Sequence, residues 1–161
     1  MKPYVIQTTR FVAGYAKMML ADVADADMTQ PAGQIVNHPA WQLGHIVYGL
    51  TNATAMLKGQ EPDMPAWATA CGMGSSPEAC VTTMPGKAEL LAGYEAAAEA
   101  FAAALAETDD ATLAAPNPAE DLRAMMPTLG DMVTFLATAH AAVHLGQASA
   151  WRRARGGKPL F

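Results

Sequence analysis

The chain has 161 residues, of which 52% are hydrophobic, and a formal net charge of −5 at pH 7. A nucleic-acid-binding protein normally presents a basic face, so this balance argues against a nucleic-acid partner. No apolar run approaches membrane-spanning length, and polar residues break the N-terminal apolar stretch, so neither a signal sequence nor a membrane anchor is expected. We therefore expect a soluble, cytoplasmic protein whose residues 1–161 form a single domain.

The composition favours helices over strands, because alanine, leucine and methionine are abundant and β-branched alternation is scarce. A first helix is predicted over residues 4–22. Its large apolar residues fall on one stripe, which comprises Tyr4, Phe11, Tyr15 and Met18. A second helix is predicted over residues 39–58, since proline suits the first turn of a helix and Gly59 supplies a C-terminal stop.

The second predicted helix carries an aromatic and partly polar face. On it His45 lies with Trp41, Tyr48 and Asn52, a mixture that suits the wall of a site better than a plain core. His38 precedes His45 by about two turns, or roughly 10 Å along the axis. We therefore interpret His38 as a residue of the helix terminus or of a pocket rim, not as a ligand of the same ion.

The next segment, residues 60–84, is rich in proline and glycine and shows no sustained period. A connection of this length is often functional, and we expect it to cover one end of the bundle. Its apolar anchors are predicted to be Met64, Trp67 and Met73. It also holds Cys71 and Cys80, a number that suits a reducing compartment, although a disulfide within the loop stays open.

Two further helices complete the pattern. One is predicted to begin near residue 85 and to end before residue 108, with an inward stripe of Leu90, Tyr94, Ala97, Phe101 and Leu105. After a second connection over residues 114–127, another begins at Thr128, where Asp131 takes the place of glutamate in a capping box. Basic residues close to its end, from Arg152 to Lys158, complement the helix dipole. The four helices predict an all-α four-helix bundle with long connections.

The last predicted helix carries His140 and His144, which are four residues apart and project from one side. Both lie on its apolar stripe, which runs through Leu129, Val133, Leu136, His140, His144, Gln147 and Trp151. A buried imidazole needs a hydrogen bond or a metal, since an unpaired polar group costs about 1–3 kcal/mol. With His45 as a third inward imidazole, the pattern predicts a metal site whose open positions are typical of catalytic zinc.

The identity of the metal does not follow from the ligands. A three-histidine site accepts a divalent ion according to supply, with zinc or nickel expected most and iron also compatible. Tyr48, Asn52 and Gln147 are the polar side chains expected near the ion, where they would orient ligands or substrate. The alternative is that they only satisfy backbone groups between helices.

The two histidine segments carry a resemblance. Residues 37–45 read Asn-His-Pro-Ala-Trp-Gln-Leu-Gly-His, and residues 140–147 read His-Ala-Ala-Val-His-Leu-Gly-Gln. Together they resemble the DinB/YfiT-like superfamily, in which Trp-x-Leu-Gly-His on the second helix and His-x-x-x-His-x-Gly-Gln on the fourth supply a metal-binding triad. The resemblance implies a metal-binding four-helix bundle, often a homodimer, with His45, His140 and His144 as the ligands.

The resemblance also implies a chemistry. Characterised members of the superfamily include metal-dependent transferases that use low-molecular-weight thiols such as bacillithiol or mycothiol. A cation held by neutral ligands should favour a bound thiolate, which would attack an electrophilic small molecule. The alternatives are a hydrolase using metal-bound water, for which Glu78 could serve as a base, and a non-catalytic, stress-related metal-binding bundle. No catalytic residue beyond the ligands is assigned.

Overall fold

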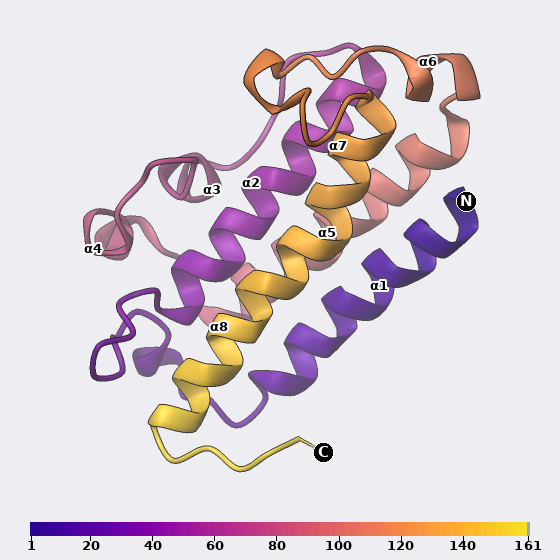
Figure 1. The fold of residues 1–161 in the computed structure, drawn as a ribbon. Helices are drawn as coiled ribbons and strands as arrows, with labels where there is room; N and C mark the ends of the chain where they lie inside the picture. The colour runs from indigo at the N-terminus through magenta and orange to yellow at the C-terminus, as the bar shows by residue number, and fades with distance from the viewer. Residues whose placement is uncertain (161) are drawn as a thin grey trace.

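A computed structural model describes residues 1–160 of the chain (Figure 1). Four long helical segments lie side by side as a bundle, and the described residues include isolated β-bridges but no strand. The long segments are α1 (Lys2–Met19), α2 (Pro39–Lys58), α5 (Lys87–Glu107) and a last segment formed by α7 (Leu129–Phe135), a π-helical turn (Leu136–His140) and α8 (Ala141–Ala154). The prediction of an all-α bundle is confirmed.

Shorter elements occupy the connections. They are α3 (Ala66–Ala70), α4 (Pro77–Cys80), α6 (Asp110–Ala114) and the 3-10 turns Asp25–Asp27, Val81–Thr83 and Glu120–Leu122. Within the described residues, no helix is both long enough and apolar enough to cross a membrane.

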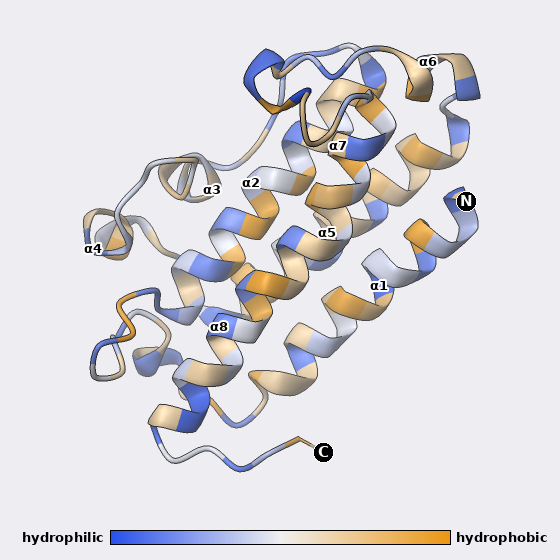
Figure 2. Cartoon of the chain, in the orientation of Figure 1, coloured by the Kyte–Doolittle hydropathy of each residue, from blue (hydrophilic) through white to orange (hydrophobic). Residues whose placement is uncertain are grey.

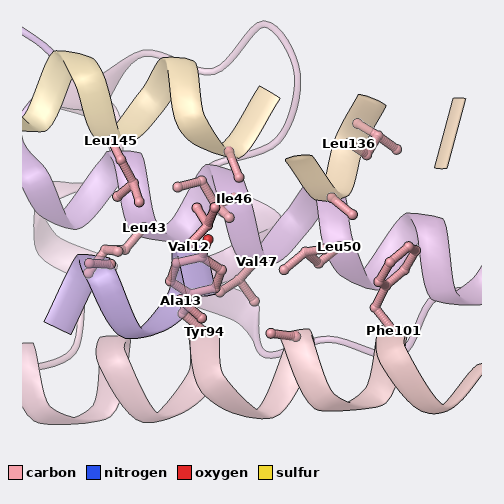
Figure 3. Packing of buried hydrophobic residues seen from close by; sticks show 14 of the residues in the cluster. Val12, Ala13, Leu43, Ile46, Val47, Leu50, Tyr94, Phe101, Leu136 and Leu145 are labelled. Atoms are coloured by element: carbon pink, nitrogen blue, oxygen red, sulfur yellow. The ribbon is translucent and has the colours of Figure 1, made fainter. Parts of the chain in front are cut away.

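The core lies where α2 and α5 pack together and where α1 and the last segment close over them. Each long helix carries both hydrophobic and hydrophilic residues, as an amphipathic bundle helix should (Figure 2). The largest buried side chains meet between the helices, and a part of this cluster is drawn in Figure 3. They include Trp151, Tyr94, Phe101, Met19, Leu43, Ile46 and Leu50.

The predicted stripe of α1 is not its buried face. Tyr4, Phe11 and Met18 are 81%, 67% and 49% exposed. The buried positions carry mostly smaller side chains instead, namely Val5, Thr9, Val12, Ala13, Ala16 and Met19. Small side chains let α1 approach α5 and the last segment closely, so packing at native density selects this face over the one with the larger rings.

Several predicted helix ends are confirmed. The imidazole of His38 caps α2 by accepting a hydrogen bond from the Trp41 backbone N–H at 3.1 Å, and Gly59 ends the helix in the left-handed conformation. Thr128 and Asp131 form the expected capping box at the start of α7. Local sequence signals therefore fix these boundaries.

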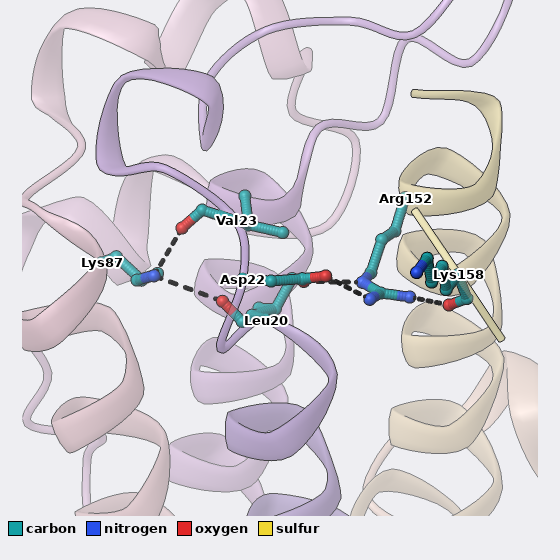
Figure 4. Close-up of polar contacts among 6 residues, drawn as sticks. All are labelled: Leu20, Asp22, Val23, Lys87, Arg152 and Lys158. Atoms are coloured by element: carbon teal, nitrogen blue, oxygen red, sulfur yellow. Dashed lines mark hydrogen bonds and ion pairs between the residues drawn. The ribbon is translucent and has the colours of Figure 1, made fainter. Parts of the chain in front are cut away.

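The basic residues at the end of α8 make contacts within the chain. Arg152 pairs with Asp22, just beyond α1, and also donates to the backbone oxygen of Lys158 (Figure 4). Arg155 pairs with Asp27 through a single bond. On the other side of this junction, Lys87 donates to backbone oxygens that follow α1 (Figure 4). These contacts support a structural role for the basic cluster, which the sequence predicts from its position at a helix end.

The connection between α2 and α5 lies along the side of α2 and not across an end of the bundle (Figure 1). Trp67 anchors it, as predicted, because its ring is buried and packs over Gly93 of α5. Met73 is 87% exposed, so its prediction as an anchor was wrong. Cys71 and Cys80 are buried instead, and the Cys71 thiol packs over Gly44 of α2 so closely that no larger residue fits there.

Candidate metal centre

Three imidazoles meet between α2 and the last helical segment. His45 comes from the second turn of α2, His140 ends the π-helical turn, and His144 lies one turn later on α8. One nitrogen of each ring lies within 4.8 Å of the others. The ring centroids are 4.6 Å apart for His140 and His144, 4.7 Å for His45 and His144, and 5.1 Å for His45 and His140. The structure thus brings together the three histidines that the sequence singles out.

The π-helical turn is a feature that the sequence pattern does not reveal. It spans Leu136–His140 and interrupts the α-helical ladder directly before α8. Such turns are rare and are frequent at functional sites. On the facing helix, Gly49 lies beside the His140 ring, and a Cβ there would make an ordinary contact at 3.4 Å from the ring's Cε1 atom. A local change of helix type therefore places His140.

Hydrogen bonds fix the orientation of two rings. The Nδ1 atom of His45 lies 2.6 Å from the backbone oxygen of Cys71. Because a carbonyl oxygen can only accept, Nδ1 carries the proton and Nε2 is left for a ligand. In His144 the Nδ1 atom lies 3.0 Å from Oε1 of Gln42, with the same consequence.

Gln42 is a residue that the sequence reasoning missed. Its side chain is fully buried on α2, and its Nε2 atom donates to the backbone oxygen of Asn37 at 3.1 Å. That bond turns the amide so that its oxygen faces His144. The sequence does contain a signal for this role: a glutamine lies on an apolar helix face one turn before His45. A buried amide needs hydrogen-bond partners, and a nearby imidazole can be one of them.

The three polar residues predicted near the ion have different surroundings. The ring of Tyr48 stacks near that of His45, with centroids 6.3 Å apart. Gln147 accepts a hydrogen bond from Asn37 at 2.9 Å and so joins the same polar chain as Gln42. Asn52 donates at 2.8 Å to the backbone oxygen of Tyr48 in its own helix, which matches the alternative of satisfying a backbone group.

Aromatic rings wall the site. The Trp41 ring lies nearly parallel to that of His45, with centroids 4.9 Å apart, and its Nε1 atom donates to Ser75 in the connection. On the opposite helix, Phe135 lies against His140 with a centroid distance of 5.7 Å. His45 is thus held between Trp41 and Tyr48, which restricts the motion of its ring.

The protonation of the cluster suits metal binding. Burial, and secondly the proximity of the other imidazoles, lowers the pKa of His140 and of His144 to about 4. Both rings are therefore neutral at pH 7, which is the form that binds a cation. In addition, Nδ1 of His140 is buried without a hydrogen-bond partner in the described part of the chain. An unsatisfied buried nitrogen within a set of three imidazoles is an arrangement that a metal ion would complete.

The distances also fit a single ion. Zinc binds imidazole nitrogen at about 2.0–2.1 Å, so two nitrogens that share it lie at most about 4.2 Å apart. The three nitrogens here lie within 4.8 Å of one another, and small side-chain rotations would close the set around an ion. The donor set fits zinc, nickel or iron, and it leaves coordination positions for a substrate.

Comparison with known protein families shows to which family the chain belongs. The sequence model of the DinB superfamily matches residues 11–148, a span that contains all three histidines. The chain belongs to the DinB superfamily. No curated protein and no solved structure matches it significantly. Membership of the DinB superfamily and the three-histidine cluster together fit a metal-dependent function at this centre.

No carboxylate joins the cluster within the described residues, where the group that could hold a metal consists of the three histidines. Glu78, considered from the sequence as a base, is an exposed residue in the first turn of α4. Asp131 is occupied in the capping box of α7. The centre therefore offers imidazole nitrogen and open positions but no neighbouring acid.

Proposed function

We propose that this DinB-superfamily protein is a metal-dependent transferase that activates a low-molecular-weight thiol for attack on an electrophilic small molecule. The observation that carries the proposal is the donor set, namely three clustered imidazoles, two of which burial keeps neutral, with no carboxylate among them. Neutral ligands leave a divalent cation with its full charge, which favours an anionic sulfur ligand over a neutral one. The known thiol-using members of the superfamily point in the same direction.

The residues of the metal centre have separate roles. His45, His140 and His144 would hold the metal, whose chemistry is to lower the pKa of a bound thiol and so to favour the thiolate, which is the nucleophilic form. Cys71, through its backbone oxygen, and Gln42, through its amide, keep one nitrogen of His45 and His144 directed to the ion. The aromatic rings of Trp41 and Tyr48 hold the His45 ring in place between them.

The sulfur nucleophile has to come from a second substrate. The chain has two cysteines, and both are buried in the connection between α2 and α5. Burial raises the pKa of the Cys71 thiol and of the Cys80 thiol, so neither is a thiolate at pH 7. A soluble thiol that reaches the open metal positions meets no such obstacle.

Hydrolysis is the less well supported alternative. A metal-bound water usually transfers its proton to a neighbouring base during attack. The described part of the chain places no carboxylate in the histidine cluster: Glu78 lies in α4, and Asp131 lies in the capping box of α7. A thiol needs less help, because its pKa of about 8.5 is already close to neutrality.

The test is turnover of an activated aryl halide by zinc- or nickel-loaded protein, with glutathione, coenzyme A, bacillithiol and mycothiol offered one at a time. We expect product only when a thiol is present, and we expect a chelator to stop the reaction. The matched control is His140→Gln, which should be inactive while it keeps its helical content. Turnover that persists without any thiol would favour hydrolysis, and full activity of His140→Gln would reject the site.

A further inference from the structure

A second cluster of possible metal ligands lies next to the three imidazoles. It consists of sulfur atoms and includes none of the histidines. The Sγ atom of Cys71 lies 3.8 Å from Sγ of Cys80 and 3.8 Å from Sδ of Met84. Both cysteines are fully buried, and Met84 is half-buried beside them. All the thiols of the chain are therefore gathered with one thioether in a single place.

The spacing of these sulfurs matches a shared metal ion. Metal–thiolate bonds are about 2.3 Å long, so two sulfurs on one ion in a trigonal arrangement lie roughly 4 Å apart. The observed 3.8 Å between Cys71 and each of its sulfur neighbours is close to that value. A disulfide, by contrast, needs the two sulfurs about 2 Å apart and has no use for the thioether.

The donor types point to one class of ion. Within the described residues, no histidine, aspartate, glutamate or further cysteine joins the pair closely enough to make a site, so the third donor has to be Met84. Zinc favours four nitrogen, oxygen or thiolate ligands, whereas thiolate and thioether ligands together select Cu(I). We propose that Cys71, Cys80 and Met84 form a binding site for Cu(I), separate from the three-histidine centre.

The surroundings suit a soft ion of low coordination number. The ring of Trp41 and the side chain of Ala70 pack against the sulfurs, and the thiol of Cys71 rests on Gly44. Such an apolar pocket offers little to a hard cation, which would need oxygen ligands or water. Cu(I) needs neither, because two or three sulfurs complete its coordination.

The binding step balances without an oxidant or a reductant. As Cu(I) enters, the two S–H bonds of Cys71 and Cys80 break, two S–Cu bonds form and two protons leave to solvent. The thioether of Met84 adds a neutral third bond. Cys80 at present donates its S–H to the backbone oxygen of Pro77, a bond that would be given up.

The test uses the full chain, reduced, metal-free and kept without oxygen. Cu(I) is titrated into it against a coloured Cu(I) chelator, and one equivalent should be withdrawn from the chelator with release of two protons. X-ray absorption at the copper edge should show sulfur neighbours at about 2.3 Å. Cys71→Ser and Cys80→Ser should abolish this binding, and His140→Gln should leave it unchanged.

A matched pair of methionine variants separates a three-sulfur site from a simple pair of thiols. Met84→Leu keeps the volume and removes the sulfur, and it should weaken Cu(I) binding by about tenfold or more. Met73→Leu in the same connection should change nothing, because that side chain is 87% exposed.

Three results would overturn the proposal. They are failure of the unaltered chain to hold Cu(I) against the chelator, equal affinity of the two methionine variants, and loss of copper in His140→Gln but not in Cys71→Ser. Because the readout is Cu(I) binding, failure of the thiol-transfer assay would not affect it.

Discussion

The two sides of the bundle use polar residues in opposite ways. Between α1 and α5 the ion pairs are exposed, with Arg10 2.7 Å from Glu99 and Lys17 3.0 Å from Glu95. Exposed pairs of this kind contribute little to stability, since water and salt screen them. The interior of this side is mostly apolar; its polar groups are the Thr9 hydroxyl, which bonds to the backbone of its own helix, and the Tyr94 hydroxyl, which is buried without a partner in the described residues.

Between α2 and α8 the polar groups are buried or half-buried, and they are connected. His144 bonds to Gln42, Gln42 to Asn37, and Asn37 to Gln147, while His45 bonds to the Cys71 backbone. A buried polar group is costly unless it is paired, so this side gives up some hydrophobic stabilisation in exchange for fixed ring orientations. The α1–α5 side thus keeps its charged groups in solvent, whereas α2 and the last helical segment contribute to the core and also position the imidazoles.

The largest expected effect comes from removal of a ligand. His45→Ala and His144→Ala should each lower metal affinity by at least about a hundredfold, because two imidazoles hold an ion far less well than three. Elemental analysis of the purified variants measures the effect, with circular dichroism to verify folding. Full metal retention in both variants would show that His45 and His144 do not hold the ion, and the α2–α8 side would then have no special role.

Next in size is Gln42→Leu. Loss of the amide frees the His144 ring and should weaken metal binding by about 10–100-fold while the fold persists. The control is Asn52→Leu, whose amide bonds only within α2 and whose loss should change affinity much less. Competition titration with a zinc indicator compares the two, and equal losses would show that the polar chain has no special role.

A glycine substitution within α2 should lower metal affinity less than Gln42→Leu does. In Gly44→Ala the new Cβ would meet the Cys71 sulfur at 2.5 Å, which displaces the segment whose carbonyl holds His45. We expect a stability loss of about 1–3 kcal/mol and weaker metal binding. Gly146→Ala on α8 has open space around it and should stabilise the protein slightly. Chemical denaturation of both variants checks the pair, and a neutral Gly44→Ala would contradict the expected clash.

Acid should destabilise the metal-free protein. Burial lowers the pKa of His140 and His144 to about 4, whereas an unfolded histidine titrates near about 6.5. Between these values the unfolded chain binds more protons, so stability is lost as the pH falls from about 6.5 towards 4. Burial also lowers the pKa of His38, which adds a contribution of the same sign. Urea unfolding midpoints measured across this range give the change of stability with pH, which should be smaller in His144→Gln than in the unaltered chain. An equal change in both would mean that other groups cause the loss of stability.

The smallest effect is expected on the opposite side of the bundle. Arg10→Ala removes an exposed partner of Glu99, and it should leave metal affinity unchanged and lower the thermal midpoint by at most about 2 °C. Differential scanning calorimetry and the same zinc titration check both statements. A loss of metal affinity in this variant would mean that the two sides are coupled.

Much of the architecture could be predicted because its signals are local. Gly59 ends α2, and the Thr128–Asp131 capping box begins α7, through bonds between residues close in sequence. The imidazoles could be singled out because His45, His140 and His144 fall on helix faces that a 3.6-residue period identifies.

The rest depends on how distant segments meet. The bond between Gln42 and His144 joins residues 102 positions apart, so it requires the register of two packed helices. The π-helical turn before His140 changes the register within one helix and leaves no mark in the hydrophobic period. Close packing of small residues determines which face of α1 is buried. The sequence pattern instead draws attention to the larger apolar residues Tyr4, Phe11 and Met18, which are exposed.

The most direct test of the metal centre is a crystal of the protein grown with zinc and measured at the zinc absorption edge. We predict one strong anomalous peak bonded, at about 2.1 Å, to a nitrogen from each of His45, His140 and His144. No peak at this position, or a peak held by other residues while the three rings keep apart, would contradict it.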